Sequence, residues 1–546
     1  MSDQDANMLN SRMALAGRLR TFMLSALNNL ILAKPAHVSD RSAGILLTLI
    51  VLIALAIKLV GLSLHPLWPD AGYTHTMTEY SWGTLLTTPL DSHPPGYYMI
   101  AKLFHAVGEG EAWLRMPSVV SAVLSIGVMF LIGRQISGNL CGLIIASLTG
   151  SSGMLDYHGQ RARMYTVLFL LLSVCVYAAI CLFQRLVATS VSELETKRGP
   201  DPVPAALLYT LAGIAALNTQ TAAVFMLAAL GFVSLPFMWQ AYRNNRFSVI
   251  ALWLGAQILM ALAWLPWLLN LGSVMGSGQV AWIDQPSPPA AFTLLMNLYA
   301  SWILPIYVDL IFLALLGLGT VVVVLHKRWD VAAIALASAI FYPVIVWSFG
   351  IVQPIFIDRA LIPALIGSFT VIGLALAHLR LPKAGWAGIL VVVIGAQLAT
   401  VVLSRAWPDR QDWRTATEVA LEDADESTAI FIPEPFSYHA FRFYAEPVAD
   451  RVFYSWSKSE GDVYAFTDDD FLEEHGSTPV DRLSKGRQFT DIPGDIDIIR
   501  VVDFAHHNPL ADPTSDWLET RGWRQTSRQV IPSRVQLHIV DFERAN

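Results

Sequence analysis

The stretch GILLTLIVLIALAIKLVGLS, residues 44–63, decides the fold class of this 546-residue chain. It is an apolar run whose only charged residue is Lys58, and a run of about 20 residues is what an α-helix needs to cross a membrane. Comparable runs lie near 117–133, 139–155, 164–184, 205–218, 221–239, 249–271, 303–325, 331–349, 360–378 and 385–403. The sequence therefore predicts a polytopic α-helical membrane protein with about eleven transmembrane helices.

The composition agrees with this prediction. Hydrophobic residues make up 54% of the chain and charged residues 14%, whereas soluble domains average roughly 25% charged residues. The three cysteines, Cys141, Cys175 and Cys181, all lie in apolar runs, which excludes a disulfide framework. The sequence has no CxxC or HExxH metal signature. These features exclude a disordered chain, a disulfide-rich secreted domain and a soluble nucleic-acid-binding protein, so we expect no nucleic-acid partner.

The charge balance divides the chain after residue 403. Residues 404–546 contain 27 acidic and 15 basic residues, whereas the first 403 residues contain 16 acidic and 21 basic residues. The tail alternates apolar strands, at 429–432, 498–504 and 535–540, with helical stretches such as 413–421. We therefore expect a transmembrane domain at 44–403 and a small soluble α/β domain at 404–546.

The basic residues also predict an orientation. Most Arg and Lys residues of the first 403 fall in alternate loops, which the positive-inside rule places in the cytoplasm. The segment 1–43 is then cytoplasmic and carries an interfacial helix, and an odd number of spans puts the tail outside. Two external loops are long: 64–116, and 272–302, which is rich in Gly and Pro and ends in an amphipathic stretch at 292–302.

Candidate catalytic residues lie in the first external loop. Asp70 follows the first apolar run in LWPDAGY (67–73), and a carboxylate there is well placed to accept a proton from an incoming hydroxyl or amine. In DSHPPGYY (91–98), the two prolines hold Asp91 and His93 in an extended turn. Tyr97 and Tyr98 then begin an amphipathic helix. An ordinary hydrated acid and an aromatic belt are the alternative interpretations.

Arginines on the outer side form a second group of candidates. Gln160, Arg161 and Arg163 stand with Tyr165 at the start of one apolar run, and Arg359 stands at the start of another. Outer arginines oppose the positive-inside trend, and a guanidinium is a bidentate ligand for phosphate. The alternative for each arginine is contact with lipid headgroups. Together with the acids, these residues suit a lipid-phosphate substrate that reacts outside the membrane.

Two further charged residues lie within or beside apolar runs. Lys58 is most simply a lysine that snorkels to the membrane surface. Asp309 is either a cleft residue or a boundary acid, and the sequence leaves this open.

The order of these motifs resembles the integral-membrane glycosyltransferases of the GT-C superfamily, in particular bacterial relatives of dolichyl-phosphate-mannose–protein mannosyltransferases (glycosyltransferase family 39). WPDAGY (68–73) is similar to their W-x-D-E-A-Y, and DSHPPGYY (91–98) to D-G-H-P-P-L-Y-Y. Four further similarities are LRMPS (114–118) to L-R-L-P-S, QRARMY (160–165) to Q-E-A-R-M-Y, RALIPAL (359–365) to R-Y-L-L-P-A-L, and DWR (412–414) to D-W-R. Trp282 with Pro286 and Pro288 is similar to the external lipid loop. Each motif is weak alone, and the shared order is specific.

The resemblance implies transfer of a hexose or pentose from a polyprenyl-phosphate donor. The acceptor would be an envelope glycan, a glycolipid or a protein. The reaction would take place at the outer face of the bacterial inner membrane, where membrane lipids would be further partners. Asp70 would be the general base, Asp91 a second catalytic residue, and Arg163 and Arg359 the ligands of the carrier phosphate. The other expected substrate-binding residues are His93, Tyr97, Gln160, Arg161 and Tyr165. A divalent metal stays open, because Asp70, Asp91 and His93 offer ligands without a metal-site spacing.

The chain departs from the family motifs at two positions. Ala71 and Arg161 each stand where the family has Glu. Arg161 either adds a phosphate contact, suits an anionic substrate, or marks a catalytically altered scaffold of the same fold. A lipid-linked saccharide transporter is the other alternative, although such a protein needs polar groups along a path across the membrane.

Overall fold

The structure is a computed structural model, and its residues are described in twelve segments. These are 36–88, 90–187, 202–275, 283–380, 382–407, 411–433, 436–445, 453–457, 462–466, 487–489, 496–504 and 518–545. Most of the expected interfacial helix in 1–43 and Trp282 of the external lipid loop lie outside them.

Long apolar helices dominate the described part of the chain, and eight spans in it have the length and composition to cross a membrane. They correspond to α2 (Asp40–Leu59), α6 (Gly110–Ser137), α9 (Tyr165–Val187), α12 (Ala223–Arg243), α13 (Phe247–Met275), α15 (Asp309–Leu325), the continuous stretch 329–349, and α20 (Lys383–Ala406). The stretch 329–349 comprises α16 (Trp329–Ala335), the π-helix η3 (Leu336–Phe341) and α17 (Tyr342–Phe349). The protein is thus an integral membrane protein of the helical class, as the sequence predicts.

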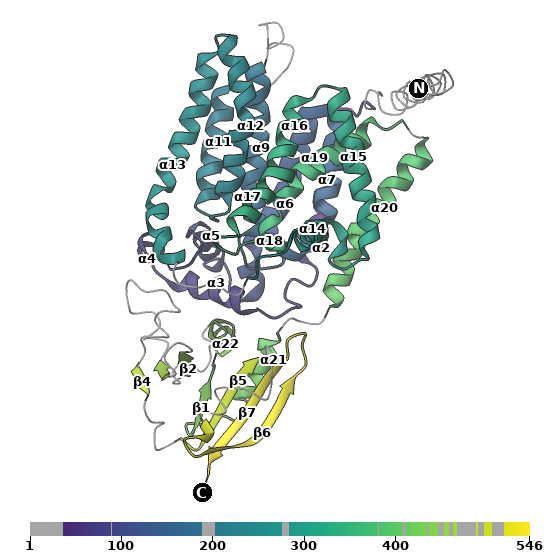
Figure 1. The fold of residues 1–546 in the computed structure, drawn as a ribbon. Helices are drawn as coiled ribbons and strands as arrows, with labels where there is room; N and C mark the ends of the chain where they lie inside the picture. The colour runs from purple at the N-terminus through teal and green to yellow at the C-terminus, as the bar shows by residue number, and fades with distance from the viewer. Residues whose placement is uncertain are drawn as a thin grey trace, which may run out of the picture.

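Three shorter apolar helices pack among these spans: α7 (Asn139–Ser151), α11 (Pro202–Leu217) and α19 (Ala364–His378). All 15 residues of α19 are buried, so this helix forms the centre of the bundle. A helix that is apolar on every side fits such a position. Figure 1 shows the membrane helices gathered in one bundle, with the strands of the tail below it.

The first external loop is largely helical. It contains α3 (Pro69–Glu79), α4 (Trp82–Thr87) and α5 (Gly96–His105). Proline at the first position of α3 and directly before α5 explains where these helices begin, because its φ is preset and its missing N–H is not needed there. The three helices lie between the membrane bundle and the tail (Figure 1).

The external lipid loop ends in short helical segments. They are α14 (Pro288–Met296) and the π-helix η1 (Asn297–Ser301), and the 3₁₀-helix η2 (Ile306–Val308) follows the loop. α18 (Asp358–Leu361) lies beside α14 and η1. Asp309 is buried, and its carboxylate accepts a hydrogen bond from the Ala300 amide at 3.1 Å. This acid therefore holds the η1 turn against α15.

The tail folds around a seven-stranded mixed sheet with strand order β4-β3-β2-β1-β5-β7-β6. Its strands are β1 (Thr428–Phe431), β2 (Phe453–Ser457), β3 (Asp462–Phe466), β4 (Arg487–Phe489), β5 (Ile498–Phe504), β6 (Trp523–Ile531) and β7 (Leu537–Arg544). β1 runs parallel to β2 and β5, and the other pairs are antiparallel. With α21 (Trp413–Leu421) and α22 (Tyr438–Ala445), this is the expected α/β architecture.

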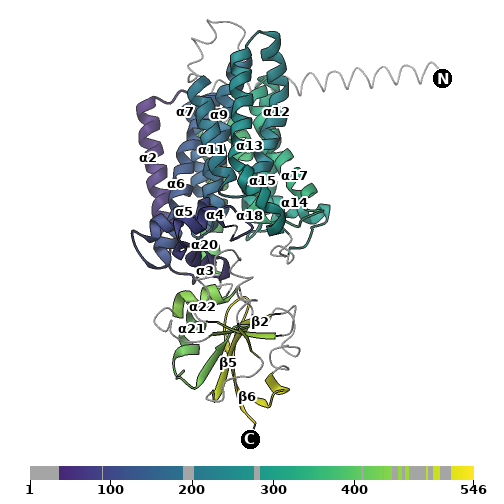
Figure 2. The same ribbon diagram turned by 90° about the vertical axis from the view of Figure 1, so that its left-hand side faces the viewer.

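The tail packs directly on the first external helix. α22 lies against α3 in both views (Figures 1 and 2). Gly72 makes the close approach feasible, because a Cβ atom there would lie 2.5 Å from the backbone of His439 and Ala440. The Thr76 hydroxyl and His439 Nδ1 are 2.9 Å apart, and Arg442 forms an ion pair with Glu79. The helix that carries Asp70 is therefore held by the tail.

Candidate active site

Asp70 lies in the first turn of α3, directly after Pro69. A negative side chain is favoured at this end of a helix, where the backbone N–H groups are unpaired. The carbonyl of Asp70 accepts hydrogen bonds from Arg163 Nη1 at 3.2 Å and from the Thr74 hydroxyl at 3.1 Å. The side chain itself is half-buried, so α3 presents a partly accessible carboxylate beside a guanidinium.

Asp91 binds the hydroxyl of Tyr98. One carboxylate oxygen accepts the Tyr98 hydroxyl, and the other accepts the Ser92 amide at 2.7 Å. Burial raises the pKa of Tyr98 well above its usual range, and the charge of Asp91 raises it further. Tyr98 therefore stays protonated and donates to Asp91. The sequence had assigned Tyr98 only to an interfacial helix, and its pairing with Asp91 was missed.

The His93 imidazole lies within electrostatic range of both acids and both arginines. Burial lowers its pKa, the charges of Asp91 and Asp70 oppose that effect, and those of Arg163 and Arg359 add to it. Its Nδ1 atom is buried and has no hydrogen-bond partner in the described part of the chain. The imidazole is consequently neutral at pH 7.

Arg163 lies at the centre of this group and is 5% exposed. Besides the Asp70 carbonyl, its Nη1 donates to the Tyr98 hydroxyl at 3.4 Å. Burial opposes its charge, but Tyr98, Asp70, Tyr165 and Asp91 together raise its pKa well above the usual value. Its cationic form is thus secured by neighbouring oxygen atoms.

Arg359 approaches from α18. Its guanidinium carbon lies 5.8 Å from the centre of the Trp68 ring and 6.0 Å from that of Tyr165, within cation–π range. Burial opposes the charge of Arg359, whereas Tyr165, Asp70 and Asp358 raise its pKa. Asp70 therefore acts electrostatically on both arginines, which come from segments far apart in sequence.

Tyr97 stands behind this group. Its side chain is fully buried, and its hydroxyl lies 3.1 Å from the Ser118 hydroxyl. Ser118 in turn donates to the carbonyl of Arg163 at 2.8 Å. Tyr97 thus supports the backbone that carries Arg163.

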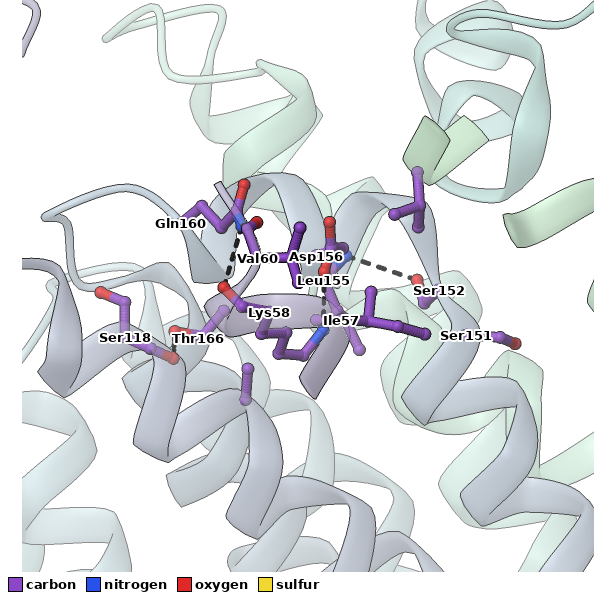
Figure 3. A network of polar contacts seen from close by, with 12 residues as sticks. Ile57, Lys58, Val60, Ser118, Ser151, Ser152, Leu155, Asp156, Gln160 and Thr166 are labelled. Carbon is purple, nitrogen blue, oxygen red and sulfur yellow. Dashed lines mark hydrogen bonds and ion pairs between the residues drawn. The ribbon is translucent and has the colours of Figure 1, made fainter. Parts of the chain in front are cut away.

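Gln160 and Arg161 line a small cavity. Its other lining residues include Leu62, His65 and Arg405. Gln160 Nε2 donates to the carbonyls of Lys58 at 2.9 Å and Val60 at 3.1 Å, so this side chain closes the end of α2 (Figure 3). The Arg161 guanidinium lies 4.6 Å from the Tyr157 ring centre and 5.7 Å from that of Trp68. Arg161 therefore lines this cavity and also contacts Trp68, the ring that Arg359 approaches.

The interpretation of Lys58 as a snorkelling lysine is wrong. Its side chain is fully buried, and its Nζ atom lies 3.4 Å from Asp156 (Figure 3). Asp156 is on the short helix α8 (Gly153–Gly159), and its other oxygen pairs with Arg405 at 2.9 Å. The one available signal for this network was an acid directly after an apolar run, which tends to have a partner.

The described residues contain no group of three or more His, Cys, Asp and Glu side chains arranged to hold a metal ion.

The last motif, at 412–414, connects the tail to the membrane bundle through Arg414. Asp412 caps α21, and Arg414 pairs with Glu111 at 2.6 Å.

Comparisons with known proteins agree with this architecture. No protein-family model matches the sequence, and no curated protein matches it. Among solved structures, the chain is similar to ArnT from Cupriavidus metallidurans in the apo state, with a TM-score of 0.57 and 13% identity over 90% of this chain and 97% of that one. The likeness to the same protein bound to undecaprenyl phosphate has a TM-score of 0.52, again with 13% identity and the same coverage. The chain therefore shares the fold of this solved structure. This confirms the fold that the motif order predicts.

Proposed function

We propose that the protein is a membrane glycosyltransferase that moves a sugar from a polyprenyl-phosphate donor to an acceptor on the extracytoplasmic face. The observation that carries the proposal is the position of Asp70, whose charge acts on both Arg163 and Arg359. A proton acceptor next to two phosphate-binding cations meets the needs of this reaction. The solved ArnT structure with undecaprenyl phosphate supports a lipid-phosphate donor for a chain of this fold.

In the proposed reaction, Asp70 takes the proton of the acceptor hydroxyl or amine. The nucleophile attacks the anomeric carbon while the bond from that carbon to the phosphate oxygen breaks. A single displacement of this kind inverts the anomeric configuration. The polyprenyl phosphate leaves as an anion, and Arg163 and Arg359 stabilise the negative charge that develops on it.

Asp91 takes a positioning role in this scheme. It binds the Tyr98 hydroxyl, and the same hydroxyl accepts a hydrogen bond from Arg163. The three side chains form a relay that orients the guanidinium toward the carrier phosphate. His93, neutral because of burial, adds a hydrogen-bonding group without a competing charge.

The experiment is sugar transfer by purified protein from undecaprenyl-phosphate sugars to a panel of glycan, glycolipid and peptide acceptors. Removing the base through Asp70→Asn should lower the rate about 10²–10⁴-fold, with the thermal unfolding temperature unchanged. Glu109→Gln is the matched control, since it neutralises an exposed acid on the same outer segment.

Two outcomes would contradict the proposal. Full activity in Asp70→Asn would remove the base from the mechanism. Movement of the lipid-linked sugar across vesicles without formation of a new glycosidic bond would identify a transporter instead.

A further inference from the structure

The small polar cavity lined by Gln160 and Arg161 has no role in the proposed reaction. It opens between the end of α2, α8 and the end of α20, and its polar lining includes His65, Arg115, Gln160, Arg161 and Arg405. Its volume of about 10 Å³ admits one water-sized group. Three positively charged arginines around so small a space favour the binding of an anionic atom inside it.

Part of the hydrogen-bonding capacity of these arginines is unused. Arg115 is 2% exposed and donates to the carbonyls of Leu62 and His65, whereas its Nε has no partner in the described part of the chain. Arg405 donates to the Ile57 carbonyl and to Asp156, and its buried Nε is likewise unpaired there. Buried donors of this kind are costly unless a ligand or water satisfies them.

Arg161 supplies an uncompensated positive charge at the same cavity. Within the described segments its guanidinium contacts the rings of Tyr157 and Trp68, and no carboxylate lies within ion-pairing distance. This is also the position at which the family motif carries Glu. The exchange therefore replaces an acid with a cation at the mouth of a basic cavity.

The ion pairs around the cavity leave a positive excess. The carboxylate of Glu111 forms ion pairs with Arg115 at 3.4 Å and with Arg414 at 2.6 Å. The carboxylate of Asp156 forms ion pairs with both Lys58 and Arg405. Two acids thus face four cations before Arg161 is counted. Such a field attracts an anion and repels a second cation.

An apolar groove lies next to this cavity, along the outer ends of α2 and α6. It has a volume of about 560 Å³ and is lined by Leu59, Leu62, Leu64, Ala112, Trp113 and Met116. Gly61 and Leu62 line both spaces, so the groove and the cavity are neighbours. Leu59 and Leu64 are 43% and 57% exposed at the end of a transmembrane helix, where lipid chains meet the protein.

We propose that this groove and cavity form a binding site for a membrane lipid with a net anionic phosphate headgroup, separate from the carrier site at Arg163 and Arg359. One phosphoryl oxygen enters the cavity and accepts hydrogen bonds from Arg115, Arg161 and Arg405. The rest of the headgroup stays at the mouth, and an acyl chain follows the groove. An apolar channel that opens at the membrane favours a lipid phosphate over a free anion. The site does not depend on the proposed transfer reaction.

The test uses full-length protein in nanodiscs with a phosphatidic acid that carries a photoreactive group on one acyl chain. Crosslinked peptides should contain residues 59–64 or 112–116. Labelling should fall about tenfold in Arg161→Gln, since a charged hydrogen bond is lost. Leu64→Glu, which places an acid in the groove at an exposed position, should lower it similarly, whereas Leu103→Glu, equally exposed at 57% on α5, should not.

Four further results decide between the alternatives. A phosphatidylcholine probe that labels equally well, or full labelling in both Arg161→Gln and Leu64→Glu, would overturn the proposal. Loss of labelling in the presence of millimolar inorganic phosphate would indicate a free-anion site and reject the lipid. Arg163→Gln should retain labelling, and its loss there would assign the lipid to the donor site instead.

Discussion

The outer face of the bundle carries two groups of buried cations whose partners differ. Arg163 donates to a backbone carbonyl and a phenol hydroxyl, both uncharged. Lys58 and Arg405 instead share the carboxylate of Asp156. A cation bound to neutral oxygens keeps its whole charge available for a ligand, whereas a cation paired with a buried carboxylate also stabilises the fold. The partner of a cation therefore indicates how strongly its loss should disturb the fold.

The largest expected effect is the loss of stability when the network of Lys58, Asp156 and Arg405 is disrupted. Asp156→Asn leaves Lys58 buried without a counter-charge, which typically costs about 3–5 kcal/mol. We expect a large drop in the thermal unfolding temperature in detergent. The double variant Lys58→Met, Asp156→Leu should recover most of the loss, because apolar replacement of a buried pair is often neutral. An unchanged unfolding temperature in Asp156→Asn would show that the pair does not stabilise the fold.

The opposite pattern is expected at the candidate site. Arg163→Gln should lower sugar transfer by about 10²–10³-fold, the usual effect of losing one donor to a developing anion, while the unfolding temperature changes little. Arg405→Gln is the matched comparison, and it should lower stability while preserving the rate per folded molecule. If both variants lose activity to the same extent, the distinction between the two groups fails.

Much of the fold could be predicted from hydropathy alone, because each membrane-crossing run is a local signal. The predicted run 385–403 became α20 (Lys383–Ala406), and the predicted helix 413–421 matches α21. The pairing of Lys58 with Asp156 could not be predicted, since the two residues are 98 positions apart and only tertiary packing brings them together.

The candidate site was only partly accessible to sequence reasoning. The motif order singled out Asp70, Arg163 and Arg359, and the structure brings them into electrostatic contact. The sequence grouped Arg161 with Arg163 as substrate-binding residues, whereas Arg161 lines the small cavity and Arg163 donates to the Asp70 carbonyl. Both lie in the irregular turn between α8 and α9, where no helical or strand period fixes which way a side chain points.

Acidification should weaken the contact between α3 and α22. Burial lowers the pKa of His75 to about 3, with further effects from His105 and Arg442, and lowers that of His439 to about 3, with Arg442 and His75 adding. The unfolded chain binds these protons near pH 6.5. The stabilisation is therefore complete above pH 6.5 and is lost as the pH falls toward 3.

At pH 5 each of the two histidines should destabilise the folded state by about 2 kcal/mol. Unfolding temperatures of detergent-solubilised protein between pH 8 and pH 5 measure the effect. His439→Gln should flatten the curve, whereas His37→Gln, at an exposed position, should leave it unchanged. Identical curves for wild type and His439→Gln would place the acid sensitivity elsewhere.

The smallest effect is expected for Gly72→Ala, at the uncharged part of the contact between α3 and α22. Gly72 lies inside α3 and has no left-handed backbone conformation, so α3 itself accepts a Cβ atom there, and the clash in Gly72→Ala is with the backbone of His439 and Ala440 at 2.5 Å. Relieving it requires α22 to move, at a cost of about 1–2 kcal/mol. Because α3 also carries Asp70, we expect a few-fold lower transfer rate with a modest drop in unfolding temperature. Gly83→Ala on α4, where the nearest atom would be an ordinary 3.6 Å away, is the control. Wild-type rate and stability in Gly72→Ala would contradict the close packing of α22 on α3.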